Sequence, residues 1–577
     1  MKRCPECRRD YYDDSLLYCL EDGTALVQGS VPFLEEPQTA ILSEPPASGG
    51  GRFSESSTRH QIHATAAEAE SPSTFHGSTE RQRLSTHLAA KPLIAVAVML
   101  AILGGGFFGY RYLNSSGKQI ESIAVMPFVN DSGDPEVEYL SDGMTETLIG
   151  SLSQLPNLSV KPRTSVFRYK GKDMSLQSIA NELRVQAILN GRVVQRGDQL
   201  ILSLELIDPA KDVVLWSQQY NRKQSDLVSL QSEIARDVSN KLKSKLSGVD
   251  EQKVAKSYTA NSDAYQFYLK GRYYWNKRTA ENLKKAMEHF QQAADTDPNY
   301  ALAYSGLADC YVVLGDYTGT PNRESLPKAR AFAERALQLD SSLVEAQTSW
   351  AYSFALLWQW DRAEIEFKKA IEINPNYATA HHWYSLTLTE TGRIEEALRE
   401  IKRAQEVDPL SLIISYNVAL TQLFIGDVNG SVQQSKRLID LDPNFPRAHQ
   451  SLAQAYLKQE RYLEAIEEFQ KAVSLSPGDR QSLRDLGYGY AVAGKRSEAL
   501  VVLKQLQAKY EKGEAFPADV AAVLAGLGDK DGAFAWLEKD FQGREGRLAR
   551  IRYHMPYEPL RTDPRYADLL RRMGLNP

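Results

Sequence analysis

The chain is poor in cysteine and carries almost no excess of charge. Its 577 residues include only 4 cysteines, which excludes a scaffold held together by disulfides. Lys and Arg number 68 against 73 Asp and Glu, so the net charge is −5. A protein that binds nucleic acid mainly through its phosphates usually has a basic surplus. We therefore expect no nucleic-acid partner for the bulk of the chain.

Catalytic motifs are also missing. The sequence has no G-x-x-x-x-G-K-[ST], no H-R-D or D-F-G, no H-E-x-x-H and no G-x-S-x-G. We expect a non-enzymatic protein without a small-molecule substrate. Hydrophobic residues make up 42% and charged residues 24%, which excludes a fully disordered chain and a polytopic membrane protein. The length predicts roughly three to five structural units.

Three of the four cysteines stand near the amino terminus and predict one metal site. Cys4 and Cys7 form a C-x-x-C pair, and Cys19 and Asp22 follow. Two thiolates at this spacing can hold one tetrahedral Zn²⁺ from a tight turn, and a returning hairpin brings further ligands. A carboxylate can ligate zinc, so Asp22 is the candidate fourth ligand, although an Asp-Gly pair is also typical of a simple turn. We expect residues 1–27 to form a zinc ribbon with structural Zn²⁺.

A redox C-x-x-C is the alternative, but it normally belongs to a βαβ fold, for which 27 residues leave no room. The pieces "CPEC" and "YCLEDGTAL" resemble the short zinc ribbons that begin many bacterial membrane proteins. Such a unit is too small to fold without its metal.

One long apolar run is present, and a polar stretch precedes it. Residues 28–90 are rich in Ser, Thr, Gly and Pro and contain no Tyr or Trp, so they predict a disordered linker. Residues 92–110 carry no charge and would span about 28 Å as a helix, close to the apolar thickness of a bilayer. We expect a single transmembrane helix over 91–113, with a buried core helix as the alternative.

The charges beside the apolar run predict its orientation. Arg81, Arg83 and Lys91 precede it, and Arg111 and Lys118 follow it. This slight excess, together with thiolates that survive best in a reducing compartment, places the amino terminus in the cytoplasm. In a bacterium the chain would be a single-pass protein of the inner membrane, with residues 119–577 in the periplasm.

Residues 119–247 alternate between strand and helix patterns and predict one α/β domain. Ile123–Phe128 is a short apolar run typical of a buried strand. Helix patterns cover 138–153, 176–183 and the stretch from Leu230 to Leu246, and strand patterns cover 186–195, 199–207 and 213–220.

This region resembles the TolB-amino-terminal-like (FlgO-like) α/β domain of bacterial signalling proteins. The matching pieces are "IAVMPFVNDSGDPEVEYLSDGMTETLIGSLSQLPNLSV", "RTSVFRYKGK", "ILNGRVVQRGDQLILSLELID" and "LWSQQY". In that family the domain often lies between a membrane helix and helical repeats. The resemblance implies an interaction or sensory role and no catalytic residues.

Residues 258–513 repeat with a fixed period. Pro375, Pro409, Pro443 and Pro477 follow one another at intervals of 34 residues. This period is that of tetratricopeptide repeats, each made of two antiparallel helices, and about seven repeats are expected. The interval from Pro298 to Ser341 is longer, and predicts an inserted loop at 315–325. Residues 514–577 continue the helical pattern and are expected to cap the solenoid, so the fold class is multidomain, with an all-α solenoid as its largest part.

The repeat register predicts a binding groove. Position 1 of successive repeats falls at Val344, Ala378, Leu412, Pro446 and Arg480. The larger polar residues at positions 5 and 9, which would line the concave face, are Tyr352, His382, Tyr416, Gln450, Gln454, Arg484 and Tyr488. Such a groove suits stacking and amide hydrogen bonds to an extended or helical peptide. The alternative is that these side chains only cover a solvated surface.

Two functions are compatible with these features. The first is a membrane-anchored, non-enzymatic interaction or signalling scaffold, whose repeats bind a protein or peptide partner while the α/β domain senses or docks. The second is a regulator whose zinc ribbon contacts nucleic acid or the transcription machinery. Deletion of residues 1–27 distinguishes them, because only the regulator would then lose DNA or polymerase association.

The cysteine spacing gives a first testable prediction. Freshly purified, reduced protein should contain one equivalent of zinc, and a chelator should unfold residues 1–27, because a ribbon of this size depends on its metal. Elemental analysis measures the metal and circular dichroism measures the loss of structure. Protein purified without zinc would contradict the prediction.

Overall fold

A computed structural model describes most of the chain beyond residue 119. The described residues are 2–3, 10–11, 27–28, 120–155, 158–242, 256–277, 279–544 and 547–576. The predicted zinc ligands, Cys4, Cys7, Cys19 and Asp22, lie outside them, as do the apolar run at 92–110 and almost all of the predicted linker.

Near the amino terminus, β1 (Lys2–Arg3), β2 (Asp10–Tyr11) and β3 (Val27–Gln28) pair in the order β2-β1-β3. No helix in the described part of the chain is both long and apolar enough to span a bilayer.

A mixed sheet organises the α/β domain. The strands are β4 (Ser122–Val125), β5 (Val129–Asn130), β6 (Ser159–Val160), β7 (Ala187–Arg196), β8 (Gln199–Asp208) and β9 (Val213–Lys223). Their order is β6-β4-β7-β8-β9, with β5 also pairing with β7. The pairings of β4, β5 and β6 are parallel, and those from β7 to β9 are antiparallel. The α/β domain predicted from the alternating patterns is confirmed.

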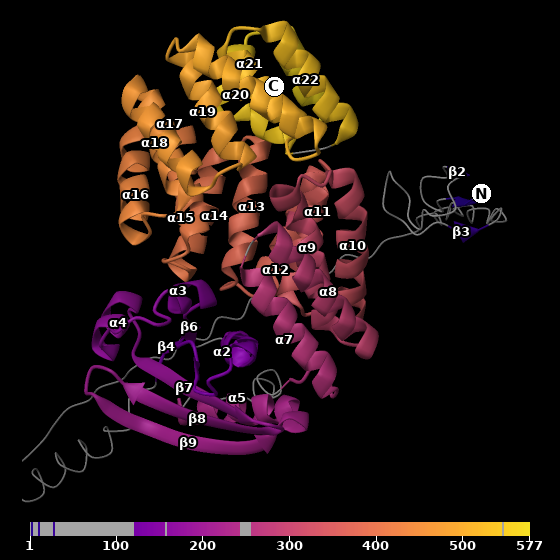
Figure 1. The fold of residues 1–577 in the computed structure, drawn as a ribbon. Coiled ribbons are helices and arrows are strands. Elements are labelled where there is room, and N and C mark those ends of the chain that lie inside the picture. The colour runs from indigo at the N-terminus through magenta and orange to yellow at the C-terminus, as the bar shows by residue number, and fades with distance from the viewer. Residues whose placement is uncertain are drawn as a thin grey trace, which may run out of the picture. The chain divides into compact units, whose positions relative to one another are not determined.

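One face of this sheet carries the core. On β8, Leu200, Leu202, Leu204 and Leu206 alternate with more exposed residues, so a single apolar face results. The helices of the domain are α2 (Glu138–Leu152), α3 (Arg163–Phe167), α4 (Leu176–Leu183) and α5 (Leu227–Lys241). Figure 1 shows all four helices on the same side of the sheet. β9 forms one edge of the sheet, where Val213, Val214 and Leu215 remain exposed.

Helix pairs make up the rest of the described chain. They are α7 (Ser262–Asn276) with α8 (Ala280–Thr296), α9 (Ala301–Thr318) with α10 (Asn322–Leu339), α11 (Val344–Leu356) with α12 (Trp360–Ile373), α13 (Ala378–Thr391) with α14 (Ile394–Val407), α15 (Leu412–Phe424) with α16 (Val428–Leu441), α17 (Pro446–Lys458) with α18 (Tyr462–Leu475), α19 (Arg480–Val492) with α20 (Arg496–Glu511), and α21 (Pro517–Gly526) with α22 (Lys530–Gly543). The short helices η3 (Leu548–Arg552) and η4 (Met555–Leu560) and helix α23 (Pro564–Arg572) complete the carboxyl-terminal region.

The repeat register is confirmed at the level of helix starts. The helices α11, α13, α15, α17 and α19 begin at the five residues assigned to repeat position 1. Local chemistry explains two of these starts. The side chain of Ser411 accepts a hydrogen bond from the N–H of Ile414, and that of Asp479 accepts one from Ser482.

Small residues allow the paired helices to approach closely. Phe290 of α8 is fully buried between Gly271 of α7 and Gly306 of α9. A Cβ atom at Gly271 would lie 2.5 Å from the Phe290 ring, and one at Gly306 would lie 2.7 Å from it. An alanine at either position would therefore force the helices apart.

The predicted inserted loop at 315–325 is wrong. The extra residues instead lengthen both helices of the pair, so that α9 and α10 have 18 residues each. Gly315 lies inside α9, and the turn is made by Gly319 with a φ of +73°. Helix propensity summed over this segment is weak, and contacts made elsewhere in the fold decide its conformation.

Two histidines that occupy the same repeat position, His381 and His449, are packing residues. The Nδ1 atoms of His381 and His449 lie 2.6 Å from Glu400 and Glu468, respectively. Each Nε2 atom lies 3.0–3.1 Å from the carbonyl oxygen of the proline six residues earlier. The same bridge in two repeats ties the start of one helix to its partner helix.

The solenoid closes on itself through its carboxyl-terminal region. Arg323, at the start of α10, donates a hydrogen bond of 2.6 Å to the carbonyl oxygen of Gly543. The indole of Trp360 donates one of 2.8 Å to the carbonyl oxygen of Met573. The ring of Trp358 stacks on Phe541 at 5.3 Å. In Figure 1, α21 and α22 accordingly lie next to the end of α11.

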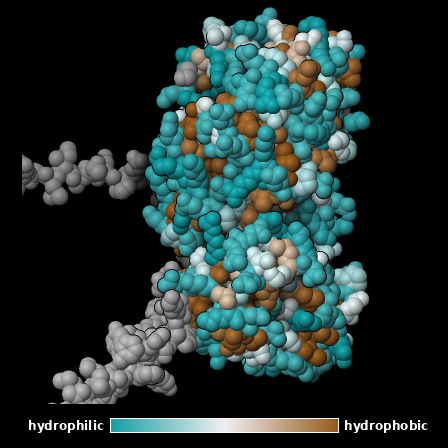
Figure 2. Space-filling view, turned by 90° about the vertical axis from the view of Figure 1, so that its left-hand side faces the viewer, coloured by the Kyte–Doolittle hydropathy of each residue, from teal (hydrophilic) through white to brown (hydrophobic). Residues whose placement is uncertain are grey.

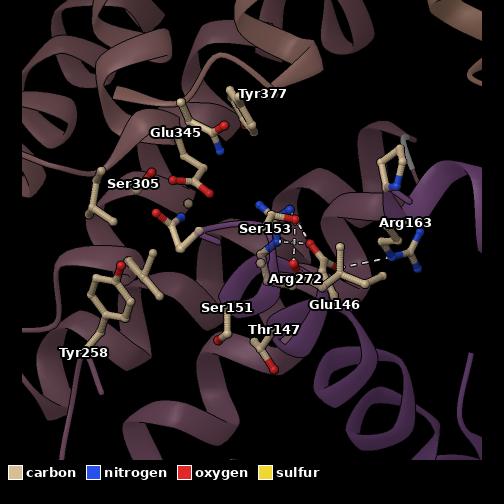
Figure 3. Close-up of a pocket in the computed structure, with 18 of the residues that line it drawn as sticks. Glu146, Thr147, Ser151, Ser153, Arg163, Tyr258, Arg272, Ser305, Glu345 and Tyr377 are labelled. Atoms are coloured by element: carbon tan, nitrogen blue, oxygen red, sulfur yellow. Dashed lines mark hydrogen bonds and ion pairs between the residues drawn. The ribbon is translucent and has the colours of Figure 1, made fainter. Parts of the chain in front are cut away.

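A buried ion network attaches the α/β domain to the first repeat. Glu146 of α2 accepts hydrogen bonds of 2.7 Å from Arg272 Nε and Asn276 Nδ2 of α7, and lies 3.1 Å from Arg163. These contacts are drawn in Figure 3. Burial opposes ionisation, but the charges of Arg272 and Arg163 hold the pKa of Glu146 below its usual value. Gly143 lets Leu269 pack directly on the α2 backbone.

A second attachment lies three repeats further along. The side chain of Asp408, between α14 and α15, accepts hydrogen bonds from the hydroxyls of Thr164 and Ser165 in α3, the latter at 2.8 Å. Asp408 is 4% exposed, so water competes little for these hydrogen bonds. The α/β domain is therefore fixed to two separate points of the solenoid.

Replacing Arg272 by Met should destabilise the attachment. The substitution leaves Glu146 buried with one cation fewer, and breaking such a pair costs about 3–5 kcal/mol. Urea unfolding of R272M should show this loss, and the double variant E146Q/R272M should recover part of it, because the buried side chain at position 146 is then neutral. Equal stability of R272M and the double variant would contradict the assignment.

Candidate functional site

The candidate site is a cavity on the inner face of the solenoid. Its volume is about 550 Å³. The first helices of successive pairs, α11, α13 and α15, form one wall, and α3 of the α/β domain completes it together with residues of the segment 547–554. Aromatic side chains supply much of the lining: Tyr352, Trp383, Tyr416, Phe424, Phe445 and Tyr553.

Three of the predicted groove residues meet at this cavity. Tyr352, His382 and Tyr416 all contribute to its wall. Tyr352 stacks on Trp383 with ring centroids 4.6 Å apart. The Nε2 atom of His382 lies 3.0 Å from the side-chain amide of Asn417. These three helix faces therefore border one cavity, although each of the three side chains is buried and none stands on an open surface.

The other four predicted residues are engaged in the interior. Gln450 donates to Ser482 at 2.7 Å, and Gln454 donates to Asp485 at 3.2 Å. Arg484 pairs with Asp485 at 2.8 Å and with Asp519 at 3.5 Å. Tyr488 would meet a Cβ atom at Gly526 of α21, so it packs against that helix. The expectation that these four residues line an open groove is corrected, because all four are buried within the fold.

The carboxyl-terminal segment explains this burial. Residues 547–560 run along the inner face, where the sequence predicted open solvent. Arg547 pairs with Glu390 of α13 at 3.1 Å and lies 5.3 Å from the Tyr352 ring. Tyr553 lies 5.9 Å from Phe424 of α15, and Glu558 pairs with Lys458 of α17 at 2.6 Å. The solenoid thus binds a segment of its own chain, one contact per repeat.

Sequence reasoning missed Arg547, Arg550, Tyr553 and His554 as residues of the site. The capping prediction for 514–577 treated the segment as a cover for the last helix pair only. A signal was present, because "RLARIRYHMPYEPLR" combines basic and aromatic residues and has only one small residue, Ala549. Such a composition is typical of a segment that docks in a groove.

The electrostatics of the segment depend on burial. Burial raises the pKa of Glu390, and the guanidinium of Arg547 opposes that rise. His554 is 8% exposed. Its burial, reinforced by the positive charges of Arg484 and Arg547, lowers its pKa to about 3. His554 is therefore neutral in the folded chain at physiological pH.

His554 should make the fold acid-sensitive. The unfolded chain takes up this proton near pH 6.5, whereas the folded chain resists it down to about pH 3. Stability should therefore fall as the pH drops through this window, by about 1.4 kcal/mol per unit at most from this group. Urea unfolding of the wild type and H554N between pH 7 and 4 measures it. An unchanged pH slope in H554N would contradict the assignment.

The described residues contain no group of three or more His, Cys, Asp or Glu side chains arranged to hold a metal ion. The zinc prediction concerns Cys4, Cys7, Cys19 and Asp22, so it stays a prediction.

Comparison with known families matches the two described domains separately. A family model for the second domain of HilA/YgeH-like transcriptional regulators matches residues 118–237. Three tetratricopeptide-repeat models match residues 278–319, 366–399 and 446–479. The resemblance of residues 121–222 to the TolB-amino-terminal-like domain stays a prediction beside this match.

Two curated relatives illustrate the similarity. A protein named putative adenylate cyclase 3 of Rhizobium meliloti is 31% identical over 248 residues, which are 42% of either chain. The transcriptional regulator HilA of Salmonella typhimurium is 22% identical over 280 residues, which are 48% of this chain and 49% of HilA. The chain spans about half the length of the curated relatives it matches.

Two solved structures are similar to part of the chain. PilF of Pseudomonas aeruginosa covers 36% of this chain with 22% identity and a TM-score of 0.29, over 94% of its own chain. Human IFIT1, solved as a dimer with m7Gppp-AAAA, covers 54% with 13% identity and a TM-score of 0.39, over 77% of its own chain. From the helix pairs at 34-residue spacing and the three repeat models, we conclude that the chain is a tetratricopeptide-repeat protein with an α/β domain ahead of its solenoid.

Proposed function

We propose that the chain is a membrane-anchored, non-enzymatic scaffold that holds a segment of a partner protein in the inner cavity of its solenoid. The observation that supports this most is the cavity of about 550 Å³ itself, which joins aromatic walls to polar groups. Pockets of this size and lining are typical of sites that bury a ligand and orient it through a few hydrogen bonds. The docked segment 547–560 supports the same proposal, because it is peptide bound to this inner face.

The charges of the cavity favour an acidic partner segment. Its wall carries Arg163, Arg447, Arg547 and Arg550 against Asp316, Glu390 and Asp408. Arg447 donates a hydrogen bond of 3.1 Å to Gln481 and lies 5.5 Å from the Tyr416 ring. No ion pair joins Arg447 to a carboxylate within the described part of the chain. A carboxylate of the partner would form an ion pair with Arg447. The tyrosines and the tryptophan of the cavity would pack against apolar side chains of the partner.

The parts outside the described residues complete the proposal. Residues 92–110 would anchor the chain in the inner membrane, with the zinc ribbon of residues 1–27 in the cytoplasm and residues 119–577 in the periplasm. In this arrangement the α/β domain and the solenoid meet periplasmic partners. A signal received there would reach the ribbon only through the membrane helix.

The regulator remains the second candidate, and the HilA/YgeH-like match of residues 118–237 is the observation that favours it. The ribbon would then contact nucleic acid or the transcription machinery. The name of the Rhizobium meliloti relative raises a cyclase activity as well. That relative is matched over 42% of its length, and the catalytic motifs searched for are missing from this sequence, so we do not extend the activity to this chain.

Site-specific photo-crosslinking tests the scaffold. A photoreactive residue at position 417, in the cavity wall, should capture a partner from cells that express the full chain. The same group at position 463, which is 68% exposed on α18, is the matched control and should not. Mass spectrometry of the adduct identifies the captured segment, which should be acidic.

The substitution R447Q should reduce this capture at least tenfold, because it removes the unpaired cation while keeping a hydrogen-bonding side chain. R403Q, on the partly exposed helix α14, should leave capture unchanged. Capture that is equal at positions 417 and 463, or unaffected by R447Q, would rule out the inner cavity as the partner site.

A further inference from the structure

A second cavity lies where the α/β domain meets the solenoid. Its volume is about 330 Å³. Figure 3 shows Glu146, Arg163 and Arg272 on one side of it and Ser305, Glu345 and Tyr377 on the other. The first set belongs to the ion network that joins the two domains, and the second set comes from helices and turns of the second, third and fourth helix pairs. The cavity therefore exists only when the domains are docked.

The cations in its wall are all paired. Arg272 is held by Glu146 and lies 3.6 Å from Asp309, and Arg163 lies 3.1 Å from Glu146. The ammonium of Lys256 pairs with Asp340 at 2.6 Å. None of these cations is left over for a further anion, so the wall does not favour an anionic ligand.

One carboxylate in the wall has no such partner. Glu345, at the second position of α11, forms no ion pair or hydrogen bond with another of the described residues. Its own backbone N–H and the more distant charge of Arg272 favour its ionised form. Burial raises the pKa of this group. Its place in the first helical turn favours an acidic residue. The preference for an acidic residue in the first turn of a helix does not explain why the Glu345 side chain faces a cavity between the two domains.

The surroundings of Glu345 add a second unsatisfied group. The hydroxyl of Ser305 is buried and has no hydrogen-bond partner among the described residues. Buried hydroxyls are usually paired, so an unpaired one in a cavity wall indicates a polar atom of a ligand. The aromatic rings of Tyr258, Tyr268 and Tyr377 line the same cavity. Tyrosine faces attract cations and shield an alkyl chain from water.

The balance of charge selects the sign of the ligand. The cavity wall carries the acids Glu146, Asp309, Glu345 and Asp408 and the bases Arg163, Lys256 and Arg272, so one negative charge is in excess. Asp408 is already satisfied by two hydroxyls, which leaves Glu345 as the counter-ion. A single carboxylate does not provide the six or more oxygens that Ca²⁺ requires. An organic cation requires only one carboxylate and an aromatic wall.

We propose that this interdomain cavity binds a small alkylammonium ion, whose N–H groups donate to the Glu345 carboxylate and the Ser305 hydroxyl while its alkyl chain lies against Tyr258 and Tyr377. Because the wall is built from both domains, the ligand stabilises their docked arrangement. The site adjoins the inner cavity proposed for the partner segment, because Arg163, Trp383 and Asp408 border both cavities. Glu345 and Ser305 line only the cavity described here.

Ligand-observed NMR with the full chain tests the site. The probe is n-butylammonium in phosphate buffer, because Tris is itself a primary amine and would compete. Binding should be saturable, with a Kd of about 1 mM or lower. The neutral isostere 1-butanol should bind at least tenfold more weakly, because it lacks the charge that Glu345 recognises.

Variants identify the residues. E345Q should weaken n-butylammonium binding at least tenfold, and S305A about threefold to tenfold, while E372Q, on the exposed face of α12, should bind as the wild type does. Circular dichroism verifies that each variant is folded. If E345Q does not fold, the affinity of S305A for n-butylammonium tests the proposal in its place. Three results would overturn the proposal. They are equal affinity for n-butylammonium and 1-butanol, wild-type affinity for n-butylammonium in E345Q (or in S305A, where E345Q does not fold), and no saturable binding up to about 50 mM.

Discussion

Closure of the solenoid on its own carboxyl-terminal region is the constraint on which the rest of the described structure depends. Arg323 and Trp360 hold backbone carbonyls of Gly543 and Met573. Those bonds bring segments about two hundred residues apart in sequence into contact, so the inner face becomes an enclosed space. Side chains such as Gln450 and Arg484, which an open solenoid would expose, must then find polar partners inside, and they do.

The sequence predicted well those structural features that are determined by residues close together in the chain. The 34-residue period predicted the starts of α11, α13, α15, α17 and α19 because each helix pair contacts mainly its neighbours. A proline stands three residues before four of these five starts. The alternating pattern of the α/β domain predicted its strands for the same reason, since one sheet face is buried and the other is not. The helix faces of Tyr352 and Tyr416 followed from the register alone.

The features that the sequence could not predict depend on contacts between segments that are far apart in the chain. The turn at Gly319 approaches the backbone of Gly513 so closely that a Cβ atom would clash with its carbonyl oxygen. Nothing in the sequence around either glycine indicates this contact. The sequence therefore predicts a loop where α9 and α10 are lengthened. The isolation of Glu345 is equally invisible, because it results from cations that other carboxylates have already paired.

The two attachments of the α/β domain have a mechanical consequence. A chain of stacked helix pairs is elastic, because small rotations at each junction add up to large changes of pitch along its length. Here the domain is fixed to α7 through Glu146 and to the turn before α15 through Asp408. The three pairs from α9 to α14 lie between these points, and stretching or twisting them must break buried hydrogen bonds at one end. The α/β domain therefore acts as a brace that stiffens the first four helix pairs against stretching and twisting.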